Sequence, residues 1–158
     1  MSVQNVEAEV DSDRSGELVE NKSTLAESIL EQIADAVIYA DDKGKIMRWN
    51  HAAAALFGYS AAEALGQNLD LIIPEHLRAA HWRGFEAAMT NGVMKLQGRP
   101  TLTRAAHKTG HKLYVELTFA LVKEQAGGVA RGSVAVARDV TERIEHERAS
   151  ASPKVTGG

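Results

Sequence analysis

One stretch decides the fold: residues 33–78 read IADAVIYADDKGKIMRWNHAAAALFGYSAAEALGQNLDLIIPEHLR. Two apolar runs flank a Gly-containing turn at 42–44, and this pattern predicts a β-hairpin. The alanine-rich run at 51–57 is followed by glycine and predicts a helix. Ser60 and Glu63 have the spacing of a capping box, so a second, short helix is expected directly after the first.

The rest of the chain continues this pattern with one long helix and three strands. Pro74 is suited to a first helical position and predicts a helix from Glu75 to Met89. Three strand-like runs follow, at residues 95–106, 112–122 and 129–139. Helices segregated between runs of strands favour an α+β fold, a five-stranded antiparallel sheet with short helices on one face. The space between helices and sheet is a suitable pocket for a small ligand.

The two ends of the chain differ in composition from this centre. Residues 1–20 hold six acidic side chains and one basic side chain, with only scattered apolar residues. Such a segment buries too little to offset its ordering entropy. The expected organisation is a flexible acidic tail at 1–22, a folded domain with an N-terminal cap helix at 23–140, a short helix at 141–150 and a disordered tail at 151–158.

Composition excludes several chemistries. The 158 residues contain no cysteine, which rules out disulfides, thiolate metal sites, iron–sulfur clusters, cysteine nucleophiles and flavin–cysteinyl adducts. No apolar run approaches the ~20 residues of a membrane span. The net charge of −3 argues against nucleic-acid binding. We therefore expect a cytoplasmic protein without membrane or nucleic-acid partners. Because no nucleophile triad, phosphate loop or acid pair stands out, we do not expect an enzyme.

Five short motifs occur in a characteristic order. They are KGKI at 43–46, WNHAA at 49–53, FGYS at 57–60, HKTG at 107–110 and ARDVTE at 137–142. Together they resemble the PAS domain family, and the resemblance covers about residues 24–145. It implies the PAS fold and a sensory module that signals through its terminal helices.

The long helix carries the most informative residue. Leu77, His81, Phe85 and Ala88 recur at helical spacing, so His81 is expected to point with the apolar residues toward the pocket. One interpretation is a histidine at the edge of the core, bonded to a backbone carbonyl. The other is a ligand histidine, with the neighbouring Trp82 closing the edge of the pocket.

A narrower resemblance favours the ligand. Residues 78–81, RAAH, are similar to the haem-proximal helix of FixL-type oxygen sensors, which implies His81 as axial ligand of haem b. Gly98-Arg99 resembles the element whose arginine contacts bound oxygen or a haem propionate. Leu117 and Phe119 fall where those sensors place two distal residues on one side of a strand. Phe119 is bulkier than the aliphatic residue usual there.

Other readings stay open. The pocket could hold non-covalent flavin as a redox sensor, or the module could be a cofactor-free interaction and dimerisation domain. His107 and His111 flank a hairpin turn without a third metal ligand nearby, and His146 is expected to face solvent. The expected partners are a second copy, bound through Leu25, Ile29 and the exposed sheet face, and an effector in trans such as a histidine kinase or another regulator.

Overall fold

The structure, a computed structural model, describes residues 24–96 and 98–152. Residues 24–32 form a helix that belongs to one compact unit, and the chain from Ile33 onward belongs to a second. The expected flexible tail at 1–22 lies outside the described residues. Of the tail expected at 151–158, only residues 151 and 152 are described.

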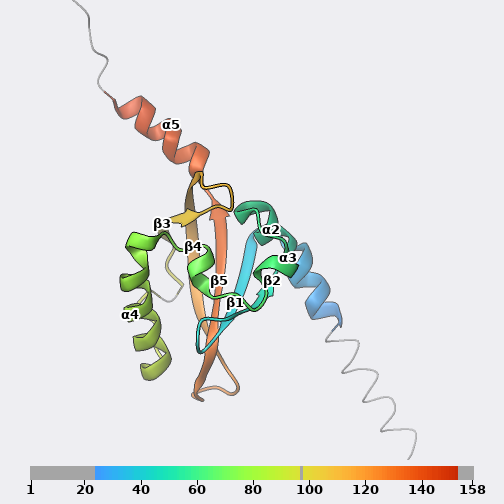
Figure 1. Ribbon diagram of the computed structural model, residues 1–158. Helices are drawn as coiled ribbons and strands as arrows, with labels where there is room; N and C mark the ends of the chain where they lie inside the picture. Colours follow the sequence, from blue (N-terminus) through green and yellow to red (C-terminus); the bar gives the residue numbers. More distant parts are fainter. Residues whose placement is uncertain (1–23, 97, 153–158) are drawn as a thin grey trace, which may run out of the picture. The chain divides into compact units, whose positions relative to one another are not determined.

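The described part of the second unit contains ten elements along the chain (Figure 1). They are β1 (Ala36–Asp41), β2 (Ile46–Trp49), α2 (His51–Phe57), α3 (Ala61–Ala64), the short 3-10 helix η1 (Leu69–Leu71), α4 (Glu75–Asn91), β3 (Thr101–Ala106), β4 (Lys112–Lys123), β5 (Ala130–Asp139) and α5 (Thr141–Ala151). All strand pairs are antiparallel, and the strand order is β2-β1-β5-β4-β3. The predicted α+β class and five-stranded antiparallel sheet are confirmed.

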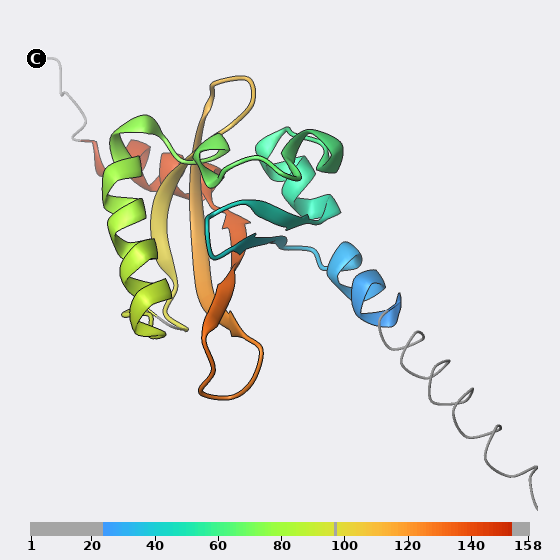
Figure 2. The same cartoon turned by 60° about the horizontal axis from the view of Figure 1, so that its bottom comes forward.

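The core lies on one face of this sheet, called the inner face below. Ile38 of β1, Val115 of β4 and Ala137 of β5 alternate onto it and are almost fully buried. Phe57 of α2 and Ala64 of α3 pack against them. Figures 1 and 2 show α2 and α3 over the β1–β2 half of the sheet and α4 along the β3–β4 half.

Capping residues begin the short helices as the sequence predicts. The Asn50 side chain accepts a hydrogen bond from the Ala53 N–H at 3.0 Å, which starts α2. Ser60 and Glu63 form the predicted capping box of α3, with the Ser60 N–H donating to Glu63 Oε2 at 2.8 Å. These caps fix where the chain leaves the sheet and where α2 and α3 lie on it.

The strand predicted to begin at residue 95 is shorter in the structure. β3 begins at Thr101, because Pro100 has no N–H for the sheet ladder. Before it, the Arg99 N–H donates to the Leu96 carbonyl at 3.0 Å, and Gly98 has a φ of +71°. The chain therefore turns just before β3, where the apolar pattern of 95–106 predicted the first part of a strand.

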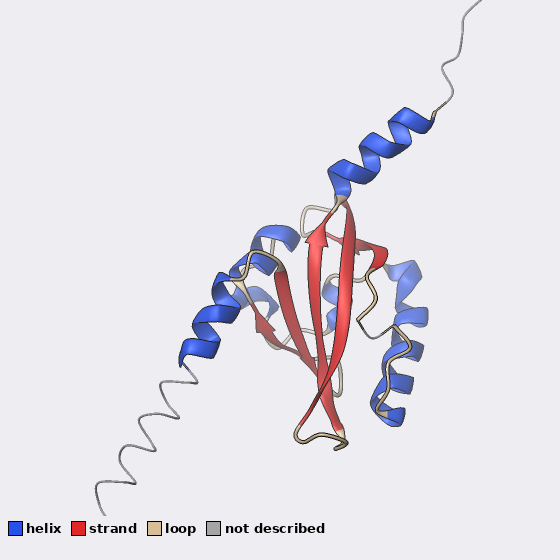
Figure 3. Cartoon of the chain, turned by 180° about the vertical axis from the view of Figure 1, so that it is seen from behind, coloured by secondary structure: helices blue, strands red, loops and turns tan. Residues whose placement is uncertain are grey.

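The opposite face of the sheet, called the outer face, meets the C-terminal helix at one place. Tyr114 of β4 is buried with Val140, the residue before α5, and with Ile144 of α5. Arg148 of α5 donates to Tyr114 Oη at 2.6 Å, and its guanidinium lies 4.7 Å from the centre of the ring. Figure 3 looks onto this face, with the long strands β4 and β5 toward the viewer and α5 leaving at the end of β5.

Candidate functional site

The site is centred on His81 in α4. The helix begins after Pro74 and ends at Gly92, whose φ of +66° is the left-handed conformation usual for a C-cap glycine. His81 and Phe85 are half-buried and Ala88 is buried, so the predicted apolar side of α4 does face the sheet. His76, one and a half turns earlier, is exposed.

The imidazole of His81 lies among aromatic rings. Its centroid is 4.9 Å from that of Trp82, with the rings nearly perpendicular, and 5.9 Å from that of Phe85. The Nδ1 atom is buried and has no hydrogen-bond partner among the residues that the structure describes. Burial lowers the pKa of His81, and the charge of Asp70 offsets this shift in part. His81 is therefore neutral at pH 7, the form in which an imidazole binds a metal.

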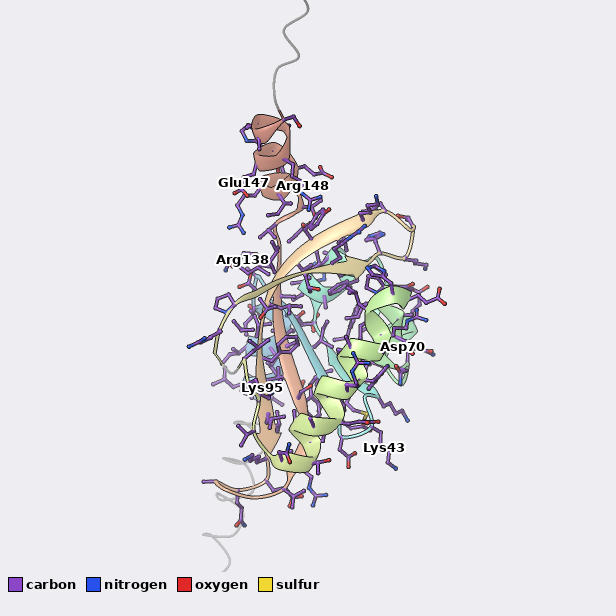
Figure 4. All side chains as sticks on the ribbon, turned by 90° about the vertical axis from the view of Figure 1, so that its left-hand side faces the viewer. Lys43, Asp70, Lys95, Arg138, Glu147 and Arg148 are labelled. Atoms are coloured by element: carbon purple, nitrogen blue, oxygen red, sulfur yellow. The ribbon has the colours of Figure 1, made fainter. Side chains whose placement is uncertain are left out.

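Trp82 connects α4 to two other elements. Its Nε1–H donates to Asp70 Oδ1 of η1 at 2.8 Å. On its other side the indole lies against Gly44 in the β1–β2 turn, where an added Cβ would come within 2.2 Å of Cη2. Figure 4 shows Asp70 beside α4, on the side where Lys43 marks this turn. The expected pocket-edge residue is thus held in a fixed orientation between η1 and the turn.

Leu117 and Phe119 lie on the inner face, as their spacing predicts. Leu117 pairs with Ala137 of β5 and packs against the buried core, and Phe119 pairs with Ala135. Leu117, Trp82 and Phe85 all border the same core cluster. The structure therefore brings five of the six predicted site residues to the inner side of the sheet or to the helix that covers it.

Arg99 is the exception. It lies in the exposed turn between α4 and β3, followed directly by Pro100. Arg99 therefore lies outside the paired part of the sheet. The strand predicted from residue 95 had included it, and its role as a contact of the gas or of a propionate stays a prediction.

An open cleft of about 340 Å³ lies at the far end of α4. It is lined by Gly92, Leu121, Lys123, Gln125 and Ala126. Leu121 continues the inner-face series of Leu117 and Phe119 along β4. Gly92 follows His81 by roughly 16 Å of helix. The cleft is thus open at this end of α4, whereas nearer His81 the side chains of Trp82 and Phe85 pack against the core.

Among the residues that the structure describes, the other histidines belong to no cluster of metal ligands. His107 and His111 stack across the tip of the β3–β4 hairpin, with ring centroids 3.9 Å apart, an arrangement that the sequence did not reveal. His146 is exposed on α5, as predicted. Over residues 24–96 and 98–152, no three histidine or acidic side chains come together as metal ligands. Within the same ranges, no helix has the length and apolar character needed to cross a membrane.

An antiparallel β2-β1-β5-β4-β3 sheet with helices on one face, and a half-buried histidine on the longest of them, defines a small sensor domain. The sequence pattern described as PAS domain matches residues 34–142. The chain belongs to the PAS domain family.

Several curated proteins are similar in sequence. Oxygen sensor protein DosP of Escherichia coli is 31% identical over 99 residues, which are 63% of this chain and 12% of that protein. Sensor protein FixL of Bradyrhizobium diazoefficiens is 43% identical over 60 residues, 38% of this chain and 12% of that protein. Cell-division control histidine kinase PdhS of Brucella ovis is 32% identical over 128 residues, 78% of this chain and 12% of that protein.

The fold also matches a solved structure, a PAS domain of a protein from Colwellia psychrerythraea. The TM-score is 0.65 at 22% identity, over 76% of this chain and 98% of that one. This likeness supports the fold. The chain spans only 12% of the length of each of the three relatives above, so it corresponds to one domain of those larger sensor and kinase proteins.

Proposed function

We propose that this PAS domain binds haem b through His81 and senses a diatomic gas such as O2, CO or NO. The observation that carries the proposal is the buried Nδ1 of His81, which has no partner among the described residues. A neutral imidazole in apolar surroundings is a suitable axial ligand for haem iron. The resemblance of residues 78–81 to the FixL-type proximal helix points to the same group.

The residues around His81 fit this cofactor in part. Phe85 and Leu117 offer the apolar surface that a haem ring requires, and Phe119 extends it along β4. When bound, haem b supplies an iron whose free coordination position takes the gas. The chain itself supplies the ligand, the apolar walls and the exclusion of water. Arg99, exposed in its turn, is left out of this proposal as a gas or propionate contact.

Signalling would follow from a shift in population between two states of the domain. A ligand at His81 acts on α4 and the inner face, and β4 links that face to Tyr114 on the outer face, against which α5 packs. We infer that the domain has no catalysis of its own and that it acts on an effector, a histidine kinase or another regulator. The similarity to histidine kinase PdhS supports this inference.

Haem uptake gives a direct test. Protein reconstituted with haemin should show a Soret band, and His81→Ala should lose it. His76→Ala is the matched control, because His76 is exposed on the same helix and should leave the band unchanged. A wild-type protein without a Soret band refutes the haem proposal.

The same spectrum separates the alternatives. Absorption near 450 nm in the purified protein would indicate a non-covalent flavin. A colourless protein that takes up neither group would favour a cofactor-free interaction module.

A further inference from the structure

The backbone of Asp70 is held by two hydrogen bonds, one to the cap of η1 and one from Arg78 of α4. Its backbone N–H donates to Asn68 Oδ1 at 2.8 Å, which caps η1. Its carbonyl accepts from Arg78 Nη2 at 3.1 Å, while Arg78 Nε donates to the Ile73 carbonyl at 3.1 Å. One arginine of α4 therefore ties the segment before the helix to its first turns. The Asp70 carboxylate is preorganised beside α4.

That carboxylate orients one indole. Trp82 Nε1 lies 2.8 Å from Asp70 Oδ1, a hydrogen bond to a charged acceptor, which is stronger than one between neutral groups. The other edge of the indole closes on Gly44, and the ring lies nearly perpendicular to that of Phe85 at a centroid distance of 5.3 Å. The ring is thereby held by contacts from η1, from the β1–β2 turn and from its own helix.

His81, in contrast, has no such anchor: among the described residues its buried Nδ1 has no partner, and no hydrogen bond is found at its other ring nitrogen. Whichever nitrogen binds a metal, the second one therefore has no protein group among these residues to orient the ring. A histidine that binds a metal usually donates its second ring nitrogen to a carboxylate or carbonyl, which sets the ring orientation. Here the nearest oriented group is Trp82, nearly perpendicular to the imidazole at 4.9 Å. The orientation of the imidazole therefore depends on packing against a ring that Asp70 holds.

We propose that Asp70 is the positioning residue for His81 and acts through the indole of Trp82. The proposal rests on the proposed function, in which His81 is the cofactor ligand. Asp70 itself contacts neither the cofactor nor the imidazole. In other histidine sites, a carboxylate or carbonyl bonded to the second ring nitrogen sets the orientation of the imidazole. Here Asp70 sets it indirectly, by holding the indole against which the imidazole packs.

The first experiment measures haem loss from the reconstituted full chain. Asp70→Leu and Trp82→Phe remove the two ends of the hydrogen bond, and each should speed haem dissociation by about 10-fold or more, the usual effect of losing an outer-shell partner. Asp70→Asn keeps an acceptor oxygen for the indole N–H and loses only the negative charge. Its rate of haem dissociation should therefore stay within about 3-fold of the wild-type rate. Glu86→Leu is the control, because Glu86 is an exposed acid on the same helix.

The second experiment needs no haem. In the NMR spectrum of the free protein, Asp70→Leu should move the Trp82 indole N–H signal and the His81 ring signals, while Asp70→Asn restores both. Unchanged His81 signals in Asp70→Leu overturn the positioning role, as does an Asp70→Asn protein that behaves like Asp70→Leu. A wild-type protein that binds no haem refutes only the proposed function, since the free protein still reports the ring orientation.

Discussion

Gly44 lies in a tight turn against the side chain of Trp82, and no larger residue fits there without a shift. Gly44 has a φ of +80° in the β1–β2 turn, where Asp41 Oδ1 accepts from the N–H groups of Lys43 and Lys45. The turn was predicted from the D-D-K-G sequence. The close approach of Trp82 to the same glycine was not, because it joins residues 38 positions apart.

Gly44→Ala should therefore cost more stability than its backbone conformation alone requires. The left-handed conformation costs about 1–2 kcal/mol for a non-glycine residue, and the clash with the Trp82 indole adds about 1–3 kcal/mol of overpacking. Urea unfolding measures the loss. Gly110→Ala is the matched control, since Gly110 has a φ of +84° but nothing within 4 Å of an added Cβ. Equal losses in both variants would mean that the indole moves aside freely.

Asn50 has a larger role than the sequence suggested. It caps α2, and its Oδ1 also accepts from the Val37 N–H at 2.9 Å, while its Nδ2 donates to the Asp35 carbonyl at 3.1 Å. The side chain is buried at 5% exposure. Local capping chemistry is readable from neighbouring residues, whereas bonds to a strand 13 positions away require the tertiary fold.

Asn50→Ala should destabilise the domain by about 2–4 kcal/mol, because it removes a cap and leaves buried donors and acceptors without partners. Ser60→Ala removes only the exposed cap of α3, so about 1 kcal/mol is expected. Thermal or urea unfolding compares the two. A loss no larger in Asn50→Ala than in Ser60→Ala would contradict the wider role of Asn50.

At the scale of elements, the tip of the β3–β4 hairpin is attached to α2 and α3. The Lys108 N–H donates to the Phe57 carbonyl at 3.0 Å, and Lys108 Nζ pairs with the Glu63 carboxylate. The His107 ring covers Gly58, where a Cβ would come within 2.6 Å of it. His107 Nδ1 accepts from the Thr109 N–H at 3.1 Å, so the hairpin favours an unprotonated nitrogen there.

This attachment should weaken in mild acid. Burial and the neighbouring His111 lower the pKa of His107 below the ordinary value of 6.5. The unfolded chain then binds a proton before the folded one, so stability is full above about pH 6.5 and falls as the pH drops toward the folded pKa. His107→Gln should flatten part of this dependence in melting temperatures measured from pH 8 to pH 5. His76→Gln, at an exposed position, should leave the profile as in the wild type.

An aromatic contact through Arg148 helps to hold the C-terminal helix on the sheet. Arg148→Ala removes both the hydrogen bond to Tyr114 and the guanidinium above its ring. We expect a loss of about 1 kcal/mol, which should speed amide exchange in α5 about 5-fold. Arg143→Ala is the control, because its pairs with Glu116 at 3.4 Å and Glu147 at 3.9 Å are exposed and contribute little. Equal protection in wild type and Arg148→Ala would contradict the role of this contact.

At the scale of the whole molecule, we propose that a second copy of the chain binds through the helix at 24–32. Leu25 and Ile29 lie one turn apart on the helix at 24–32 and are 59% and 53% exposed. Apolar residues at this spacing suit pairing with a second helix. Leu25→Glu with Ile29→Glu should therefore convert a dimer to a monomer in sedimentation experiments. Val93→Glu, at a residue that is 66% exposed, should not. Dimers that survive the double substitution would place the interface elsewhere.

The sequence predicted most of this fold because its signals are local. Periodicity identified the strands and the inward side of α4, and side-chain caps identified the short helices. It placed His81 correctly against the sheet. It placed the start of β3 too early, since the apolar pattern of 95–106 resembles a strand but Pro100 has no N–H for the ladder. No sequence pattern indicated the contact between Asp70 and Trp82, because the two residues lie in different helices, 12 positions apart.

The strand order has a consequence for the segments that flank the sheet. The start of β1 pairs with the end of β5, Ala36 opposite Ala137, and next to them Arg138 donates to both carboxylate oxygens of Asp35 at 2.9 and 2.8 Å. The points of entry and exit thus lie about one strand spacing, 5 Å, apart. Segments that precede β1 and follow β5 therefore leave the sheet from neighbouring points, so a disturbance of the β1–β5 pair reaches both of them at once.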